Sequence, residues 1–182
     1  MKKTTYIAIA AVSADGKIAA FPGQPTTWTS KEDKAFLHAM LDACDAVIVG
    51  NTTYKIARRP LSKRRCIVLT RSVKTTRQKT PDCLYLNPRS VSLSKTVARL
   101  KYHRLAVLGG AKTYTYLLEK NMLDEFYITV EPLIFGRGVS LFESKRLKDR
   151  TLKLVSAKKL NQRGSLLLHY RQARLSTAKG RS

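Results

Sequence analysis

The sequence predicts an α/β fold in three layers, with helices on both faces of a central mixed, mostly parallel sheet of about eight strands. Three observations support this fold class. Short continuous apolar runs, typical of strands buried on both faces, alternate with segments whose apolar residues recur at helical spacing. The last two strand-like segments are separated by a short glycine-containing loop, which indicates a terminal antiparallel hairpin. A length of 182 residues suits one domain with a core of its own.

The first half of the chain is expected to supply four strands and two helices. Each expected strand is a short apolar run bounded by turn residues. The first helix follows the hydroxyls of Thr29 and Ser30, which can cap it, and the second follows Gly50. The strands are expected at residues 6–12, 46–50, 64–71 and 84–86.

The second half continues this alternation and ends in the hairpin. Helices are expected at residues 90–100 and 111–119, the second of them directly after the pair Gly109-Gly110. The remaining strands are expected at 105–108, 125–134, 152–160 and 165–171, with a loop at 161–164. We therefore predict one domain over residues 1–172. The polar, basic segment 173–182 is expected to be a flexible tail.

The composition predicts a soluble cytoplasmic protein. Hydrophobic residues make up 43% of the chain and charged residues 26%, which is typical of globular domains. No apolar run approaches the ~18–20 residues that a membrane-spanning helix requires. The N-terminus does not resemble a secretory signal, because Asp15 interrupts its apolar segment early.

The three cysteines and three histidines are scattered along the chain. Cys44, Cys66 and Cys83 form no CxxC pattern, so we predict neither a zinc site nor a disulfide framework. No Ser–His–Asp or Cys–His arrangement suggests nucleophilic catalysis. We therefore expect no metal and three reduced thiols.

The formal charge of +23 is unevenly distributed. Residues 55–104 carry fifteen basic side chains and one acidic side chain, and residues 145–182 carry twelve basic and one acidic. Such a surface attracts anions, including phosphorylated metabolites and nucleic acid. The basic stretches lack the interleaved aromatic residues of an RNA-binding sheet, so we expect nonspecific nucleic-acid contact rather than a nucleic-acid function. Adaptation to an ion-rich cytoplasm is the simpler explanation of the charge.

Two expected strand–helix junctions have the chemistry of anion sites. Gly50 and Gly109 each end a strand, and threonines follow at the start of the next helix, where backbone N–H groups can bind phosphate. Neither junction is a known nucleotide fingerprint, and each alone would be an ordinary turn. Both lie at carboxyl ends of strands, where ligands bind in such sheets. With Arg71 ending the strand between them, they suit a dinucleotide that carries an extra 2′-phosphate.

An acidic pair opens the first expected helix. Glu32 and Asp33 follow Trp28 closely, in a segment with no net charge. Acids in the first turn of a helix often serve only to complement its dipole. The functional interpretation is a carboxylate that hydrogen-bonds a nitrogen heterocycle and supports its protonation during hydride transfer.

Six segments, taken in order, resemble the dihydrofolate reductase superfamily. They are YIAIAAVSADGKIA, WTSKED, DAVIVGNTTY, CIVLTR, LAVLGGAKTY and YITVEPLIFGRGVSLF. The chain resembles especially the reductase domain of riboflavin biosynthesis, which is the C-terminal half of a bifunctional deaminase–reductase, and its stand-alone relatives. No deaminase zinc motif is present in the sequence.

The resemblance implies NADPH as the cofactor and assigns site residues position by position. Asp33 falls on the catalytic carboxylate, and Trp28, Leu37 and Thr129 fall on substrate-binding positions. The implied cofactor-binding residues are Ala11, Ala19, Gly50, Asn51, Thr52, Thr53, Thr70, Arg71, Leu108, Gly109, Gly110, Ala111, Lys112, Thr113 and Tyr114. Lys74 and Arg58 are further candidates for the 2′-phosphate.

Two substrates of different pathways remain open. The segments DGKIA and GRGVSLF resemble enzymes that reduce 5-amino-6-(5-phosphoribosylamino)uracil, and we favour this small heterocyclic substrate. Asp33, Thr129 and Leu108 lean towards dihydrofolate. A basic nucleic-acid-binding relative without catalysis is a third alternative. For the proton, the sequence offers only Glu32 and Asp15 as further acids. The resemblance also suggests a homodimer formed through the C-terminal hairpin.

Overall fold

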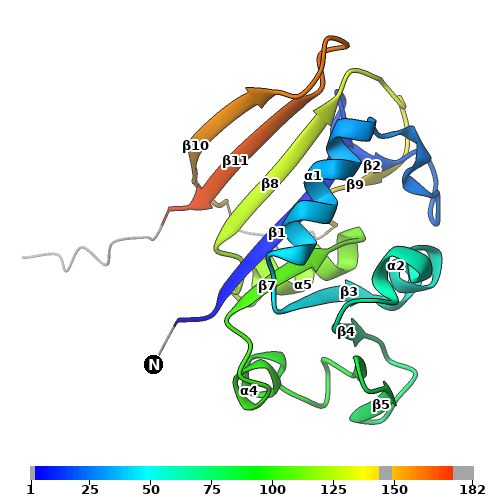
Figure 1. Ribbon diagram of the computed structural model, residues 1–182, viewed down its shortest axis with the longest axis vertical. Helices are drawn as coiled ribbons and strands as arrows, with labels where there is room; N and C mark the ends of the chain where they lie inside the picture. The colour runs from blue at the N-terminus through cyan, green and yellow to red at the C-terminus, as the bar shows by residue number, and fades with distance from the viewer. Residues whose placement is uncertain (1–2, 144–148, 174–182) are drawn as a thin grey trace, which may run out of the picture.

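The computed structural model describes residues 3–143 and 149–173. The strands of this part are β1 (Thr5–Ser13), β2 (Lys17–Ala19), β3 (Ala46–Gly50), β4 (Cys66–Leu69), β5 (Thr76–Thr80), β6 (Cys83–Leu86), β7 (Arg104–Leu108), β8 (Glu125–Glu131), β9 (Val139–Ser140), β10 (Leu152–Lys159) and β11 (Leu166–Gln172). Nine of them form one sheet in the order β10-β11-β8-β1-β7-β3-β4-β6-β5 (Figure 1). The other two, β2 and β9, pair separately.

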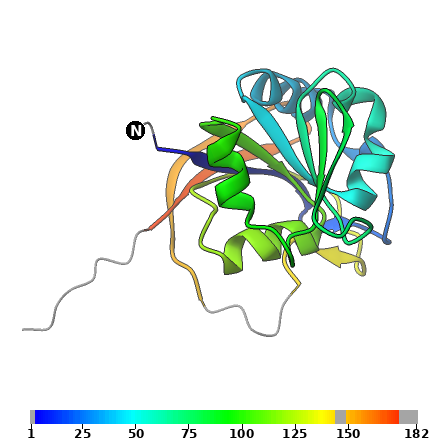
Figure 2. The ribbon, with the colours of Figure 1, turned by 90° about the horizontal axis from the view of Figure 1, so that it is seen from below.

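Helices cover both faces of the large sheet, which makes three layers (Figure 2). The helices are α1 (Lys31–Asp42), α2 (Asn51–Ile56), α3 (Arg58–Leu61), α4 (Leu93–Arg99) and α5 (Ala111–Glu119), with a short 3₁₀ helix at Thr26–Trp28. Leu41 of α1 and Leu61 of α3 belong to one apolar cluster. Val97 of α4 and Leu117 of α5 belong to a second cluster on the opposite face. The predicted three-layer α/β fold is confirmed.

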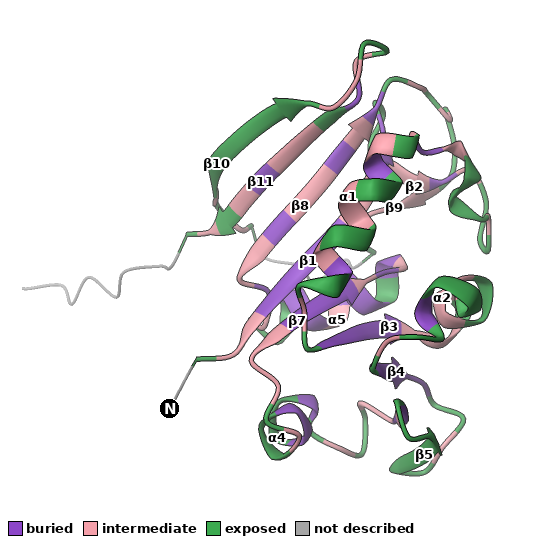
Figure 3. Ribbon diagram, viewed as in Figure 1, coloured by how far each residue is buried: buried purple, intermediate pink, exposed green. Residues whose placement is uncertain are grey.

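The middle of the sheet is parallel and its borders are antiparallel. Strands β8, β1, β7, β3, β4 and β6 run in the same direction, whereas β5, β10 and β11 run against their neighbours. The central strands are the most buried, as expected for parallel strands with helices on both faces (Figure 3). The carboxyl ends of the parallel strands therefore lie at one end of the sheet, beside the first turns of α1, α2 and α5.

Sequence patterns predicted eight strands of the large sheet and missed one. Strand β5 has the sequence TRQKT, and all five of its residues are exposed, so no apolar run marks it. The short strands β2 and β9 were also missed. The strand expected at 125–134 ends at Glu131, because Pro132 lacks the N–H group that would continue the ladder.

The terminal hairpin of β10 and β11 lies at the outer border of the sheet. Its loop closes where expected, with the backbone N–H of Leu160 donating to the carbonyl of Ser165. Leu154 and Leu166 are 50% and 41% exposed there. The expected homodimer stays a prediction. The expected tail lies outside the described residues apart from Ala173, and no described helix is long and apolar enough to cross a membrane.

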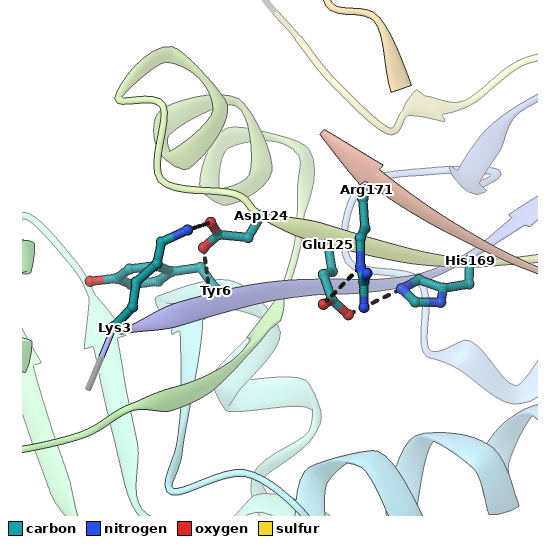
Figure 4. A network of polar contacts seen from close by, with 6 residues as sticks. All are labelled: Lys3, Tyr6, Asp124, Glu125, His169 and Arg171. Atoms are coloured by element: carbon teal, nitrogen blue, oxygen red, sulfur yellow. Dashed lines mark hydrogen bonds and ion pairs between the residues drawn. The ribbon is translucent and has the colours of Figure 1, made fainter. Parts of the chain in front are cut away.

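An ion-pair network joins the hairpin to β8 at the amino end of the sheet (Figure 4). The Nζ atom of Lys3 lies 2.9 Å from Asp124, and Glu125 contacts His169 Nε2 at 3.0 Å and Arg171 Nε at 3.4 Å. A cleft of about 1140 Å³ opens beside these residues. The carboxylates of Asp124 and Glu125 are already paired, and the carboxyl ends of the parallel strands lie at the opposite end of the sheet. We therefore assign this network a structural role.

Candidate active site

The residues predicted for the site gather where the parallel strands end. The start of α1 lies on one side of this end of the sheet, beside the carboxyl ends of β1 and β8. The starts of α2 and α5 follow the neighbouring strands β3 and β7. In such sheets ligands bind at the carboxyl ends of the strands. The prediction therefore stays that the α1 side holds the substrate (the substrate half) and that the α2 and α5 side holds a dinucleotide (the cofactor, or dinucleotide, half).

Asp33 is buried at the start of α1. Ser30 caps this helix, and its hydroxyl accepts a hydrogen bond from the backbone N–H of Asp33 at 3.2 Å. The side chain of Asp33 is only 7% exposed, and this burial raises the pKa of its carboxyl above the usual value. Hydrogen bonds from the hydroxyls of Thr129 and Thr29 act in the opposite direction. The structure thus brings together Asp33 and Thr129, as predicted.

Glu131 is a second buried carboxylate that sequence reasoning missed. It is 4% exposed and ends β8. Its Oε1 atom accepts a hydrogen bond from the backbone N–H of Ser30 at 2.7 Å, and its Oε2 atom accepts the hydroxyl of Ser165. The negative charge of Glu131 adds to the rise in the pKa of Asp33. The only sequence signal was an acid at the end of an otherwise apolar strand.

The hairpin loop reaches the same group of residues. The Nδ2 atom of Asn161 donates to Glu32 Oε2 at 3.1 Å and to Ser165 Oγ at 3.0 Å. The bond from Asn161 lowers the pKa of Glu32, which is half-buried. Glu32 is therefore an ionised tether between α1 and the hairpin and a poor proton donor.

Trp28 and Leu37 lie on either side of Asp33 in the sequence and differ in their surroundings. The indole ring of Trp28 meets Phe135 edge-on, with 5.1 Å between ring centroids. Its Nε1 atom is buried and has no acceptor among the described residues. Leu37, one helical turn after Asp33, packs against the apolar cluster beneath α1. Trp28 therefore offers a free donor, and Leu37 supports the helix.

Ala11 links the two halves of the site. It lies on β1 directly opposite Thr129 of β8 in the parallel ladder. Strand β1 is also paired with β7, which leads to the glycine pair. Ala11 is thus positioned between the buried carboxylates and the expected dinucleotide, whereas Ala19 lies on the separate strand β2.

The two riboflavin-type segments form one structural unit next to the site. Ala19 in β2 pairs with Val139 in β9, and a Cβ atom on Gly138 would lie only 2.1 Å from the carbonyl oxygen of Ala19. Asp15 accepts hydrogen bonds from Ser13 Oγ at 2.6 Å and from the backbone N–H groups of Phe135 at 3.1 Å and Gly136 at 2.9 Å. These bonds, that of Ser13 above all, lower the pKa of Asp15. Asp15 therefore fixes the loop and is a poor proton donor.

The starts of α2 and α5 approach each other closely. Gly50 and Gly110 occupy their cap positions, and neither start carries a side-chain cap. A Cβ atom on Gly50 would lie 2.6 Å from Thr113 Oγ1, and one on Gly110 would lie 4.0 Å from Thr53 Oγ1. Uncapped N–H groups and two hydroxyls thus converge where an anion such as a diphosphate fits.

The glycine pair is shaped by Tyr114. A Cβ atom on Gly109 would lie 2.1 Å from the ring of Tyr114, so only glycine fits at this position. The Gly109–Gly110 peptide is cis. The hydroxyl of Tyr114 donates to the carbonyl of Ile9 on β1, and burial raises the pKa of this hydroxyl, with a smaller contribution from Asp33. Tyr114 therefore joins the cofactor half to β1.

The predicted position of Arg71 needs correction. We expected it to end the strand between the two anion junctions, but β3 and β7 are direct neighbours and β4 lies beyond β3. Arg71 follows β4 and is exposed, whereas Thr70 is buried and its Oγ1 atom lies 2.9 Å from Ser72 Oγ. Strand order depends on long-range pairing that the sequence does not reveal. Arg71 thus borders the outer end of the dinucleotide half.

The remaining predicted cofactor residues surround the two helix starts with different exposure. Thr52 and Lys112 are exposed, Asn51 and Leu108 are half-buried, and Ala111 is buried. They lie at the same end of the sheet as the two helix starts.

Comparison with known proteins is consistent with this architecture. The family model described as RibD C-terminal domain matches residues 4–165. The protein YwjB of Bacillus subtilis (strain 168), described as uncharacterized, is 26% identical over 181 residues, which cover 95% of this chain and 100% of YwjB.

Two solved structures illustrate the shared fold. A pyrimidine reductase-like protein from Corynebacterium diphtheriae has a TM-score of 0.75 at 14% identity, covering 95% of this chain and 93% of its own. A diaminohydroxyphosphoribosylaminopyrimidine deaminase/5-amino-6-(5-phosphoribosylamino)uracil reductase from Thermotoga maritima has a TM-score of 0.70 at 18% identity. The match covers 94% of this chain but 57% of that longer enzyme. Since the family model matches most of its length, the chain belongs to the RibD C-terminal domain family, a family of reductase-type oxidoreductases with the dihydrofolate-reductase-like fold.

Proposed function

We propose that this protein is an NADPH-dependent reductase of 5-amino-6-(5-phosphoribosylamino)uracil, a small nitrogen heterocycle of riboflavin biosynthesis. The observation that carries the proposal is the pair of buried carboxylates, Asp33 and Glu131, at the same end of the sheet as the two glycine-capped helix starts. Strand β1 separates β8, which ends in Glu131, from β7, which leads to α5, and β3, which leads to α2, is the next strand after β7. Reductases of this family use a nicotinamide cofactor. The cytoplasm, where such a cofactor and substrate are available, is the expected location.

The cofactor half would hold the diphosphate and the nicotinamide. Backbone N–H groups after Gly50 and Gly110, with the hydroxyls of Thr53 and Thr113, would donate to the diphosphate. When bound, the reduced nicotinamide would supply a hydride. Arg71 would contact the 2′-phosphate, with Lys74 or Arg58 of the same basic segment as further candidates, which is the reason to expect NADPH rather than NADH.

The substrate half would bind the heterocycle through polar atoms in a dry place. The carboxyl of Asp33 can accept hydrogen bonds from ring N–H and amino groups, and the free N–H of Trp28 can donate to a carbonyl oxygen. Lys17, whose Nζ atom lies 3.3 Å from Ser140 Oγ, and the exposed Arg163 are basic candidates for the substrate phosphate. Burial strengthens each of these interactions.

A proton must accompany the hydride. Hydride addition to a C=N or C=O carbon leaves the nitrogen or oxygen to be protonated. Asp33 is the best candidate donor, because burial and the charge of Glu131 both raise its pKa, whereas Asp15 and Glu32 have lowered pKa values. Glu131 would act by favouring the protonated form of Asp33 and by holding Ser30 in place.

Dihydrofolate is the second candidate substrate. The observation in its favour is the hydrogen bond between Asp33 and the hydroxyl of Thr129, a pairing that the resemblance assigns to a folate-type site. Leu108, where riboflavin-type reductases usually carry an acid, points the same way.

An assay with both substrates and both cofactors tests the proposal. Oxidation of NADPH should follow addition of the ribosylaminouracil phosphate to purified protein and should be slower with NADH. Asp33→Asn should lower this rate by about 10²-fold or more, because it removes the proton and the charge. Turnover of dihydrofolate alone would replace the proposed substrate. Full activity of Asp33→Asn would remove Asp33 from the mechanism.

A further inference from the structure

Part of the positive charge gathers on a surface that the reductase site does not use. The chain carries 35 basic and 12 acidic side chains. Seven exposed basic residues lie on α2, α3, the connection to β4 and the border strand β5, and one of them, Arg58, is a candidate for the 2′-phosphate and is set aside, which leaves six. We call this set the basic face, and it consists of Lys55, Arg59, Lys63, Arg65, Arg77 and Lys79.

The strand register places Arg77 of the basic face on the side of the sheet that carries α2 and α3, whereas Lys79 lies at an irregularity of this register. Arg77 of β5 is directly paired with Tyr85 of β6, and residues paired in this way point to the same side. Tyr85 meets Tyr54 of α2 edge-on at 6.2 Å, so this side is the one that α2 and α3 cover. Arg77 therefore lies on the same side of the sheet as α2 and α3.

Carboxylates neutralise little of this charge. Between residues 55 and 104 the only acid is Asp82. Within the described part of the chain, Arg65 is the only member of the basic face within salt-bridge distance of a carboxylate, at 3.8 Å from Asp82. Both side chains are about 60% exposed, so this pair is weak. Clustered like charges repel each other and lower stability, which an anionic partner would offset.

We infer that the basic face binds the phosphate backbone of double-stranded nucleic acid. Duplex DNA carries one charge per about 1.7 Å of its axis, so it can engage several lysines and arginines together, unlike a single phosphorylated metabolite. Tyr54 and Tyr85 are half-buried against each other and cannot stack on bases, which disfavours single strands. Ile56 is the one large apolar side chain of this region among the exposed described residues, which is too little for insertion into a membrane.

The inference is independent of the reductase activity. None of the six residues belongs to either half of the proposed active site, and Arg71 lies at the opposite, carboxyl end of β4 from Lys63 and Arg65. Saturating NADPH should therefore leave duplex binding unchanged.

Fluorescence anisotropy with labelled DNA and RNA duplexes of about 20 base pairs tests the inference over a range of about 50–200 mM salt. The variant Lys55→Gln/Arg59→Gln/Arg77→Gln/Lys79→Gln removes four charges from the basic face. The control Lys95→Gln/Lys120→Gln/Lys153→Gln/Lys158→Gln removes four exposed charges elsewhere. Because all eight side chains are exposed, both variants should melt cooperatively near the wild-type temperature. If the basic-face variant does not melt cooperatively, the double variants Lys55→Gln/Arg59→Gln and Arg77→Gln/Lys79→Gln replace it.

For the wild type, we expect the logarithm of the association constant to fall linearly with the logarithm of the salt concentration, with a slope of about −0.9 per phosphate contact. The basic-face variant should lose at least about tenfold in affinity at 100 mM salt and about 3–4 units of slope, whereas the control should change less than about threefold. Equal losses of affinity in both variants would show that binding depends only on the net charge of the protein, which would overturn the inference. Absence of duplex binding, or tighter binding to phosphatidylserine vesicles than to duplex, would overturn it as well.

Discussion

The backbone N–H of Ser30 donates to Oε1 of Glu131 at 2.7 Å, and this bond joins the end of β8 to the cap of α1. The other oxygen of the same carboxylate accepts the hydroxyl of Ser165, which precedes β11. One buried side chain therefore fixes three segments around Asp33. The group that raises the pKa of Asp33 also determines where Asp33 lies.

Replacing Glu131 should separate its structural role from its charge. Glu131→Ala should lower the free energy of unfolding by about 2–4 kcal/mol, because it leaves two buried donors without an acceptor. Glu131→Gln retains an acceptor oxygen and should cost clearly less. Urea unfolding followed by circular dichroism measures both. Equal losses would mean that the carboxylate charge, rather than the bond to Ser30, holds the segments together.

Asp33→Asn should stabilise the protein while it impairs activity. Burial raises the pKa of Asp33 in the folded state, so the folded protein binds this proton more tightly than the unfolded chain does. Stability therefore falls as the pH rises from the unfolded pKa through the raised folded pKa, and the cost persists at neutral pH. Asparagine, which cannot ionise, should avoid this cost.

Thermal melting at several pH values checks this prediction. The variant should melt at a higher temperature than the wild type at about pH 7, and the difference should shrink towards about pH 3, where Asp33 is protonated in both states. Asp42→Asn, at an exposed carboxylate of the same helix, is the control. A variant that is less stable than the wild type at every pH would show that the hydrogen bonds of the carboxylate outweigh its burial.

The sequence predicted most of the fold because its signals are local. Glycines and hydroxyls mark the starts of α1, α2 and α5, and short apolar runs mark the buried strands. Strand β5 has no such run, since it is a border strand with every residue exposed. Periodicity cannot distinguish such a strand from a loop.

The site was predicted only in part, because some of its residues are defined by long-range contacts. Asp33, Thr129 and Ala11 were identified by resemblance, and the register of β1 with β8 brings the last two together. Glu131 was missed because its importance depends on contacts with Ser30 and with a hairpin more than thirty residues away. Long-range contacts of this kind leave no local pattern.

Gly109→Ala should destabilise the protein strongly. The added methyl group would lie 2.1 Å from the ring of Tyr114, which is buried and held by its bond to Ile9. Overpacking of this kind typically costs about 1–3 kcal/mol, and we expect a loss at the upper end of this range because the added methyl group meets a buried ring rather than a flexible side chain. Gly16→Ala, at a position with φ +77° and nothing within 4 Å, should cost only about 1–2 kcal/mol from the backbone. Chemical unfolding of both variants gives the comparison, and equal costs would contradict the crowding.

Arg71→Ala should weaken NADPH binding without changing NADH binding. A charge-assisted phosphate contact contributes about 1.5–3 kcal/mol, which corresponds to about one to two decades in dissociation constant. The contact exists only with the cofactor that carries the 2′-phosphate, so the two cofactors should converge in affinity. Arg77→Ala, which removes an exposed arginine from β5, should affect neither. Fluorescence titration of wild type and both variants with each cofactor measures the effect. An equal loss of affinity for both cofactors would place Arg71 at the diphosphate. If the preference for NADPH over NADH stays unchanged, the 2′-phosphate is bound by Lys74 or Arg58 instead. The same titration of Lys74→Ala and Arg58→Ala would then distinguish these two residues.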